Sequence, residues 1–203
     1  MSAIAVEIEP TRATAAPAAW TLPDRGVVGM ASFIIAESAI FTIFVVAYLF
    51  YLGKSASGPT PRDVLEVPIF YTICLLSSSV TIHLAGQRLR RNQSKPFLAL
   101  WLITIALGAT FLFGTAQEWR RLIYEHGLTI STNLFGTTYY SLVGLHAFHV
   151  TVGLVMLVVV LGLAVAGRVR KTHAARIDVL SLYWHFVDVV WVVVFTVVYV
   201  IGR

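Results

Sequence analysis

Five apolar stretches, separated by short polar or basic segments, most constrain what this chain can fold into. They run over about residues 27–52, 67–86, 96–119, 135–166 and 179–201. At about 1.5 Å per helical residue, each can cross a hydrocarbon layer of roughly 30 Å. Because lipid cannot satisfy backbone polar groups, such segments are expected to be helical. We therefore predict an all-α integral membrane protein, built as a single bundle of five transmembrane helices.

The composition agrees with a membrane protein. Hydrophobic residues make up 58% of the 203 and charged residues 12%, whereas a soluble domain carries roughly 25% charge. The single cysteine, Cys74, excludes a disulfide framework or a cysteine zinc site. Residues 1–26 are rich in Ala, Thr and Pro and lack the apolar core of a signal peptide. We expect them to form a flexible cytoplasmic tail.

The distribution of Lys and Arg predicts the orientation of the bundle. With five spans, ten basic residues fall on the side of the amino terminus and five on the other side. The positive-inside rule then puts the amino terminus in the cytoplasm and the carboxyl terminus outside. Because the net charge of +5 arises in these loops, we expect no nucleic-acid partner. Candidates for phospholipid headgroup contact are Arg88, Arg90, Arg91, Arg168, Arg170 and Lys171.

Ionisable residues within the apolar stretches must face protein, because they are costly in lipid. In the fifth stretch His185 and Asp188 lie three residues apart, on one face of a helix. Glu37 in the first stretch and Asp188 both lie about ten residues from the cytoplasmic helix starts, roughly 15 Å deep. We expect one buried cluster, in which Glu37 bonds a histidine of the fourth stretch, His146 or His149. Asp188 and His185 would pair locally or with neighbouring hydroxyls.

Other polar residues have simpler interpretations. Small hydroxyl residues commonly mark helix contacts in lipid, and the second stretch carries Ser77, Ser78, Ser79 and Thr81. Glu118 is expected to form an interfacial ion pair with Arg120 or Arg121 near the outer end of the third stretch. His83, His126 and His173 are expected to be solvated.

The large aromatic residues have an interfacial interpretation, since tryptophan is enriched where membrane meets water. Trp119, Trp184 and Trp191 are expected to serve partly as anchors there.

Metal or haem ligation is the alternative use of the histidines. His146 and His149 share a helix face, which is a weak metal signal. A di-iron site in a bundle uses several histidine or Glu-x-x-His pairs, and one His-x-x-His is present. A hydrogen-bonded packing role is favoured over ligation, and proton handling stays open because membrane-embedded Glu, Asp and His also build proton relays.

Several of these motifs resemble one family. The sequence Tyr-Trp-His-Phe-Val-Asp-Val-Val-Trp at 183–191 closely resembles the signature of subunit III of haem-copper terminal oxidases, the cytochrome c and quinol oxidases. The Gly-Leu-His-Ala-Phe-His of 144–149 resembles its Gly-x-His-x-x-His element. Residues 33–37 resemble its first core helix, 75–81 its serine-rich helix, and 118–119 its Glu-Tyr pair.

Two departures from the family pattern stand out. Mitochondrial-type members have seven helices, and this chain resembles the five-helix bacterial form, so a partner would have to supply the second wall of the family's lipid cleft. The glutamine usual three residues before Glu118 is Thr115 here, with Gln117 nearby. Local bonding at that end is therefore expected to differ.

The resemblance implies a non-redox subunit of a proton-pumping oxidase in the bacterial plasma membrane, most simply an aa3-type cytochrome c oxidase. No cofactor is expected in this chain, apart from bound phospholipid; haem and copper are expected in partner subunits I and II. A respiratory supercomplex is a further partner to consider. The alternatives are subunit III of a quinol oxidase, the related subunit of a nitric oxide reductase complex, an independent proton or small-solute transporter, and a self-standing membrane cytochrome.

Overall fold

The computed structural model describes residues 24–203, and five long helices dominate them. They are α1 (Arg25–Tyr51), α3 (Ile69–Arg90), α4 (Ser94–Tyr124), α5 (Leu134–Val165) and α6 (Ala174–Phe195). All five are long and apolar enough to cross a membrane, so the predicted all-helical architecture with five spans is confirmed. A π-helical segment, Thr196–Ile201, continues α6 to the end of the bundle.

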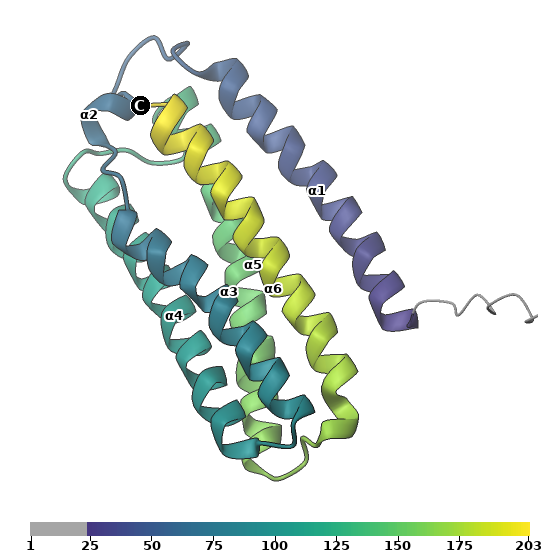
Figure 1. Ribbon diagram of the computed structural model, residues 1–203. Helices are drawn as coiled ribbons and strands as arrows, with labels where there is room; N and C mark the ends of the chain where they lie inside the picture. Colours follow the sequence, from purple (N-terminus) through teal and green to yellow (C-terminus); the bar gives the residue numbers. More distant parts are fainter. Residues whose placement is uncertain (1–23) are drawn as a thin grey trace, which may run out of the picture.

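The helices run up and down, with successive long helices joined alternately at the two ends (Figure 1). The start of α1 and the carboxyl terminus lie at opposite ends of the bundle. A three-residue turn joins α3 to α4, and Asn92 adopts the left-handed conformation there, with φ of 59°. Asparagine tolerates this conformation better than most residues. The side chains of Asp24 and Asn133 cap the starts of α1 and α5.

The connection from α1 to α3 contains one short helix, α2 (Pro61–Val64), where the sequence indicated only a loop. Its start has the features of a capping box: the Thr60 backbone N–H donates to Asp63 Oδ2 at 3.1 Å, and the Thr60 hydroxyl donates to the same oxygen at 2.6 Å. These bonds hold the pKa of the Asp63 carboxyl below its usual range.

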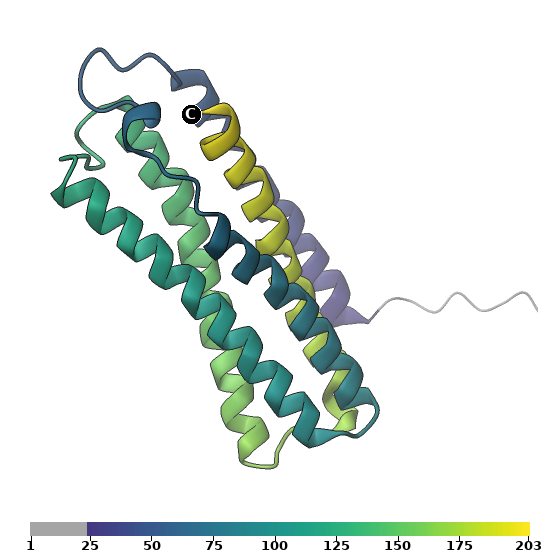
Figure 2. The same ribbon diagram turned by 60° about the vertical axis from the view of Figure 1, so that its left-hand side comes forward.

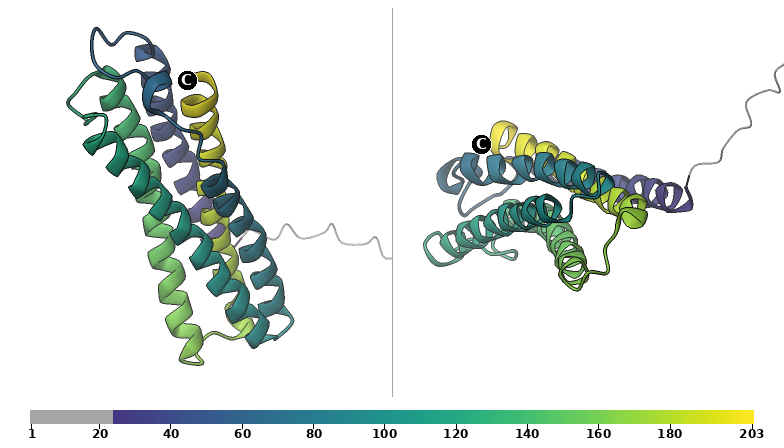
Figure 3. Two further views of the ribbon diagram at one scale, coloured as in Figure 1. Left: turned by 90° about the vertical axis from the view of Figure 1, so that its left-hand side faces the viewer. Right: turned by 60° about the horizontal axis from the view of Figure 1, so that its bottom comes forward.

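The main core lies among α3, α4, α5 and α6, and α1 packs along α5 and α6 at one margin of the bundle (Figures 2 and 3). Two glycines allow α4 and α5 to come close to the indole of Trp184. A Cβ on Gly108 would lie 2.9 Å from that ring, and one on Gly153 would lie 2.7 Å from it. Only glycine fits both positions without a shift of Trp184.

Several predicted boundaries were wrong by a turn or more. α6 begins at Ala174, five residues before the expected start, and α4 extends to Tyr124 rather than ending near residue 119. Arg25 and Gly26, assigned to the tail, already belong to α1. The rest of the predicted tail, residues 1–23, lies outside the described residues.

Candidate functional site: polar ties between the helices

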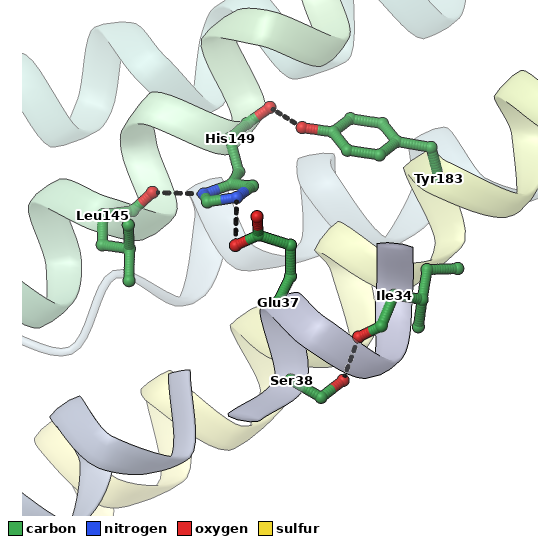
Figure 4. Close-up of polar contacts among 6 residues, drawn as sticks. All are labelled: Ile34, Glu37, Ser38, Leu145, His149 and Tyr183. Carbon is green, nitrogen blue, oxygen red and sulfur yellow. Dashed lines mark hydrogen bonds and ion pairs between the residues drawn. The ribbon is translucent and has the colours of Figure 1, made fainter. Parts of the chain in front are cut away.

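The first polar tie joins α1 to α5. Glu37 Oε2 lies 3.2 Å from Nε2 of His149, and Nδ1 of His149 lies 2.8 Å from the carbonyl oxygen of Leu145 (Figure 4). A carbonyl only accepts, so Nδ1 carries a hydrogen. The Glu37–His149 contact then needs one further proton, either on the carboxyl or on Nε2. The pair therefore shares a single proton between two helices.

Tyr183 of α6 also bonds to His149. Its hydroxyl donates to the backbone oxygen of His149 at 3.0 Å (Figure 4), and its ring lies 6.1 Å from that of Phe33 on α1. Three helices thus meet at His149. Glu37 and His149 also line an apolar groove of about 410 Å³ between α1 and α5.

The second polar tie joins α3 to α6, and Ser79 is its centre. Its Oγ lies 2.9 Å from Nδ1 of His185 and also contacts Oδ2 of Asp188. Asp188 is 3% exposed, and its other oxygen, Oδ1, is buried without a hydrogen-bond partner. The neighbouring hydroxyl expected from the sequence is therefore Ser79. The single buried cluster is wrong: Glu37 and Asp188 belong to two separate ties.

His146 belongs to neither tie. Its side chain is completely buried, and neither ring nitrogen has a hydrogen-bond partner. The ring stacks on Trp191 at 4.9 Å and meets Phe111 edge-on at 5.7 Å. Of the two histidines of the fourth span, only His149 contacts Glu37.

The tryptophans of α6 are interior residues, and the interfacial interpretation of Trp184 and Trp191 was wrong. Trp184 is 0% exposed and Trp191 1% exposed. The Trp184 indole donates to Ser78 Oγ at 2.8 Å, and that of Trp191 donates to Thr72 Oγ1 at 3.2 Å. Both bonds cross from α6 to α3, so these indoles act as interhelical donors as well as packing groups.

The hydroxyl residues of α3 contact two different helices. Thr81 Oγ1 lies 2.7 Å from Thr104 Oγ1 of α4, whereas Ser78 and Ser79 contact α6. Ser77 is partly buried, and no hydrogen bond of its side chain is found. The run of small polar residues thus lies where α3 meets both neighbours.

Glu118 does not form the expected pair with Arg120 or Arg121. Its carboxylate accepts from the hydroxyl of Tyr199, with oxygen–oxygen distances of 2.9 and 3.0 Å. Arg121 pairs instead with Glu66, in the segment that leads into α3. The reason is geometric: Glu118 faces the end of α6, whereas Arg121 faces the α2–α3 connection.

Beside the basic loops, Arg90 at the end of α3 forms an ion pair with Asp178 of α6 at 2.5 Å. Arg88 donates to the side chain of Gln93 at 3.2 Å. The other headgroup candidates are exposed, namely Arg91, Arg168, Arg170 and Lys171. Their contact with phospholipid stays a prediction.

The described residues 24–203 bring together no group of three or more His, Cys, Asp or Glu side chains of the kind that holds a metal ion. Both histidine ties are used for hydrogen bonds between helices, and His146 is enclosed by aromatic rings. This arrangement favours proton sharing and helix docking.

Sequence reasoning missed the partners that lie far along the chain. Thr72, Thr104 and Tyr199 each complete an interhelical bond, and Asp178 and Glu66 complete ion pairs. A polar residue within an apolar stretch was the available signal for the two threonines. Nothing local distinguishes Tyr199 from an ordinary interfacial tyrosine.

Comparison with known proteins agrees with this architecture. The family model for cytochrome c oxidase subunit III matches residues 21–203. Cytochrome c oxidase subunit 3 of Synechocystis sp. is 41% identical over 184 residues, which cover 88% of this chain and 77% of that protein. Cytochrome c oxidase subunit 3 of Alkalihalophilus pseudofirmus is 37% identical over 168 residues, 82% of each chain.

Relatives named for a different electron donor also match. Cytochrome bo(3) ubiquinol oxidase subunit 3 of Pseudomonas aeruginosa is 32% identical over 178 residues, 87% of this chain and 85% of that protein. The match to the family model covers far more than half of the chain. With its five apolar helices, the chain is a multi-pass plasma-membrane protein. The chain therefore belongs to the cytochrome c oxidase subunit III family, as a subunit of a multi-subunit haem-copper oxidase.

Proposed function

We propose that this chain is the non-redox subunit III of a proton-pumping aa3-type cytochrome c oxidase. In this role it stabilises subunit I and supports proton uptake, while subunits I and II contain the haem and copper. The observation that carries the proposal is the family match over residues 21–203. The first relatives reported above are named as cytochrome c oxidase subunits.

The polar ties support an indirect role in the reaction. Glu37–His149 and Ser79–His185–Asp188 bond helix to helix at membrane depth, where each unpaired polar group would be costly. A bundle fixed in this way presents a steady apolar wall to its neighbours. Such a wall limits rearrangement of water and lipid beside subunit I.

The outward faces supply the surface for that contact. α1 exposes large apolar side chains along its length, among them Ile35 at 72% and Ile43 at 67%. In a membrane these faces meet lipid or another subunit. We propose that subunit I, subunit II and phospholipid share them, with the amino terminus in the cytoplasm.

Purification of the tagged chain from its own membrane in mild detergent tests the proposal. We expect haem-containing subunits to be retained, with the optical spectrum of haem a and oxygen consumption driven by reduced cytochrome c. Purification without any haem protein would contradict the proposal, as would transport by the isolated chain in liposomes.

A quinol oxidase is the second candidate, because relatives such as that of P. aeruginosa are named for ubiquinol. The same preparation separates the two. Turnover with quinol and none with cytochrome c would favour this candidate, and nitric oxide reduction would indicate the related reductase complex.

A further inference from the structure

A polar vestibule of about 280 Å³ lies between α3 and α6, toward the end of the bundle that carries the basic loops. Its lining includes Arg90, Asp178 and His83, and His185 lines it further along α6. The positive charge of Arg90 and the negative charge of Asp178 neutralise each other in an ion pair. His185 also borders the apolar groove of about 520 Å³ between α1 and α6. His185 therefore lies where a polar space and an apolar groove meet.

Ser79 Oγ makes two hydrogen-bonded contacts, and its hydroxyl supplies a hydrogen for only one of them. A serine hydroxyl has one hydrogen, so it can donate either to Nδ1 of His185 or to Oδ2 of Asp188. The other contact must then be supplied by a proton from its partner. Two arrangements satisfy both contacts: a protonated Asp188 with Nδ1 of His185 bare, or an ionised Asp188 with a hydrogen on Nδ1.

The surroundings of Asp188 make the first arrangement available. Its Oδ1 is buried without a partner, and among the described residues no Lys or Arg side chain bonds its carboxyl. A carboxylate in that setting lacks the donors that would stabilise its charge. Its titratable neighbours are His185 on its own helix and, at the vestibule, His83 and Arg90 of α3 with Asp178 of α6. Glu37 and His149 belong to the separate α1–α5 tie.

We propose that Ser79 relays protons between Asp188 and the vestibule through His185. In unloading, the Oδ2 proton of Asp188 passes to Ser79 Oγ while the Ser79 hydrogen passes to Nδ1 of His185. The resulting imidazolium releases its Nε2 proton to water in the vestibule. Loading reverses these steps, so protons and charge balance in both directions. Nε2 has no protein partner and is not sealed in the interior, which lets water reach it.

The relay would be one way in which this chain supports proton uptake. Its physiological role therefore rests on the proposed function. Asp188 would store one proton inside the bundle and exchange it with the end that carries the basic loops. The chemistry of the relay, however, belongs to three residues of this chain and can be tested directly.

Infrared spectroscopy of the chain, purified with whatever subunits accompany it, tests the relay. The carbonyl band of a protonated Asp188 is identified by its loss in Asp188→Asn. Transfer to D₂O then shifts that band as its proton exchanges. We expect exchange to slow at least about a hundredfold in Ser79→Ala and in His185→Phe, the low end of what a positioned proton-transfer group contributes.

Ser77→Ala is the matched control, because Ser77 lies on the same helix and makes no side-chain hydrogen bond. In Ser77→Ala the Asp188 proton should exchange at the rate of the unmodified chain. In Ser79→Thr, which keeps a hydroxyl, the exchange rate should stay close to that value. Equal rates in Ser79→Ala and Ser77→Ala would overturn the relay. So would the lack of an Asp188-dependent band from mildly acid to mildly alkaline pH. Either result could occur in a preparation that retains its haem subunits, so the relay can fail while the proposed function stands.

Discussion

α6 and α1 are similarly apolar but are used in opposite ways. Of the most apolar part of the α6 segment 56% is buried inside the chain, against 11% for α1. α6 carries the interior Trp184 and Trp191, and Asp188, and all three bond to α3, whereas the buried side chains of α1 are Phe41 and Tyr48. Hydropathy alone could not distinguish the two helices.

Contacts within the chain specify the position of α6 more fully than that of α1. α6 is held by packing on three neighbours and by indole hydrogen bonds, so its position follows from contacts within the chain. α1 is held by a few interior side chains and by the Glu37–His149 tie. Its remaining surface is free for lipid or another subunit.

Trp184→Ala should cause the greatest loss of stability. Removing a buried indole costs about 3–5 kcal/mol in well-packed interiors, and this one also fills the space left by two glycines. Unfolding in detergent, followed by circular dichroism, measures the loss. Phe148→Ala, at a side chain 62% exposed, is the control and should change stability little. Equal losses of stability in the two variants would contradict the conclusion that Trp184 of α6 is a central residue of the core.

Gly153→Val should follow, at about 1–3 kcal/mol, because the added side chain overlaps the Trp184 ring. Gly162→Val on the same helix is its control, since nothing lies within 4 Å of a Cβ there. Thermal unfolding of both variants checks the difference. A harmless Gly153→Val would mean that Trp184 can move, and that the close approach of α5 is not required.

Glu37→Leu should weaken α1 docking by only about 0.6 kcal/mol, the average for an interhelical hydrogen bond in a membrane. Glu37→Gln should cost less, because its amide can donate to Nε2 of His149. Retention of partner subunits on detergent titration measures both. A hydrophobic carbodiimide should modify Glu37 through the apolar groove, and loss of that label in Glu37→Gln identifies the site. An unreactive Glu37 would indicate that the carboxyl is ionised or inaccessible.

The smallest effect is expected at Asp63, outside the membrane-spanning helices. Its pKa is lowered by the bonds from Thr60, so α2 gains stability above the unfolded pKa of this carboxyl. That gain is lost as the pH falls through the lower, folded pKa. Titration of Asp63 by NMR should show its pKa rising toward the ordinary value in Thr60→Ala. An unchanged pKa would mean that the capping bonds do not form in solution.

The sequence could predict that a carboxyl in one apolar stretch needs a partner on another, but not the direction of each side chain around its helix. Glu37 was expected to bond a histidine of the fourth stretch, and His149 indeed lies 3.2 Å away. A count of residues from the helix starts put Glu37 and Asp188 in one cluster, because it ignores which face each side chain occupies. Trp184 was misplaced for a related reason: a tryptophan near the start of an apolar stretch is typical of an interface, unless a neighbour leaves room for it inside.

Helix ends and distant partners were beyond the sequence for other reasons. α6 begins at Ala174, before the apolar stretch. Its first turns carry Arg176 and Asp178, so the apolar pattern could not mark where the helix starts. The bond between Glu118 and Tyr199 joins residues 81 positions apart, and Tyr199 lies within a π-helical segment. A π-helix turns its side chains differently from an α-helix, so its facing residues do not follow the usual spacing.

The glycines facing Trp184 also bear on the order in which the bundle can be made. α4 and α5 leave the ribosome before α6, so their shared seam stays open until residue 184 has been synthesised. A chain interrupted ahead of that residue contains four membrane-spanning helices, with the space of the missing indole between α4 and α5 unfilled. Such a fragment offers membrane proteases a loosely packed target, whereas the finished chain closes the seam with a single side chain.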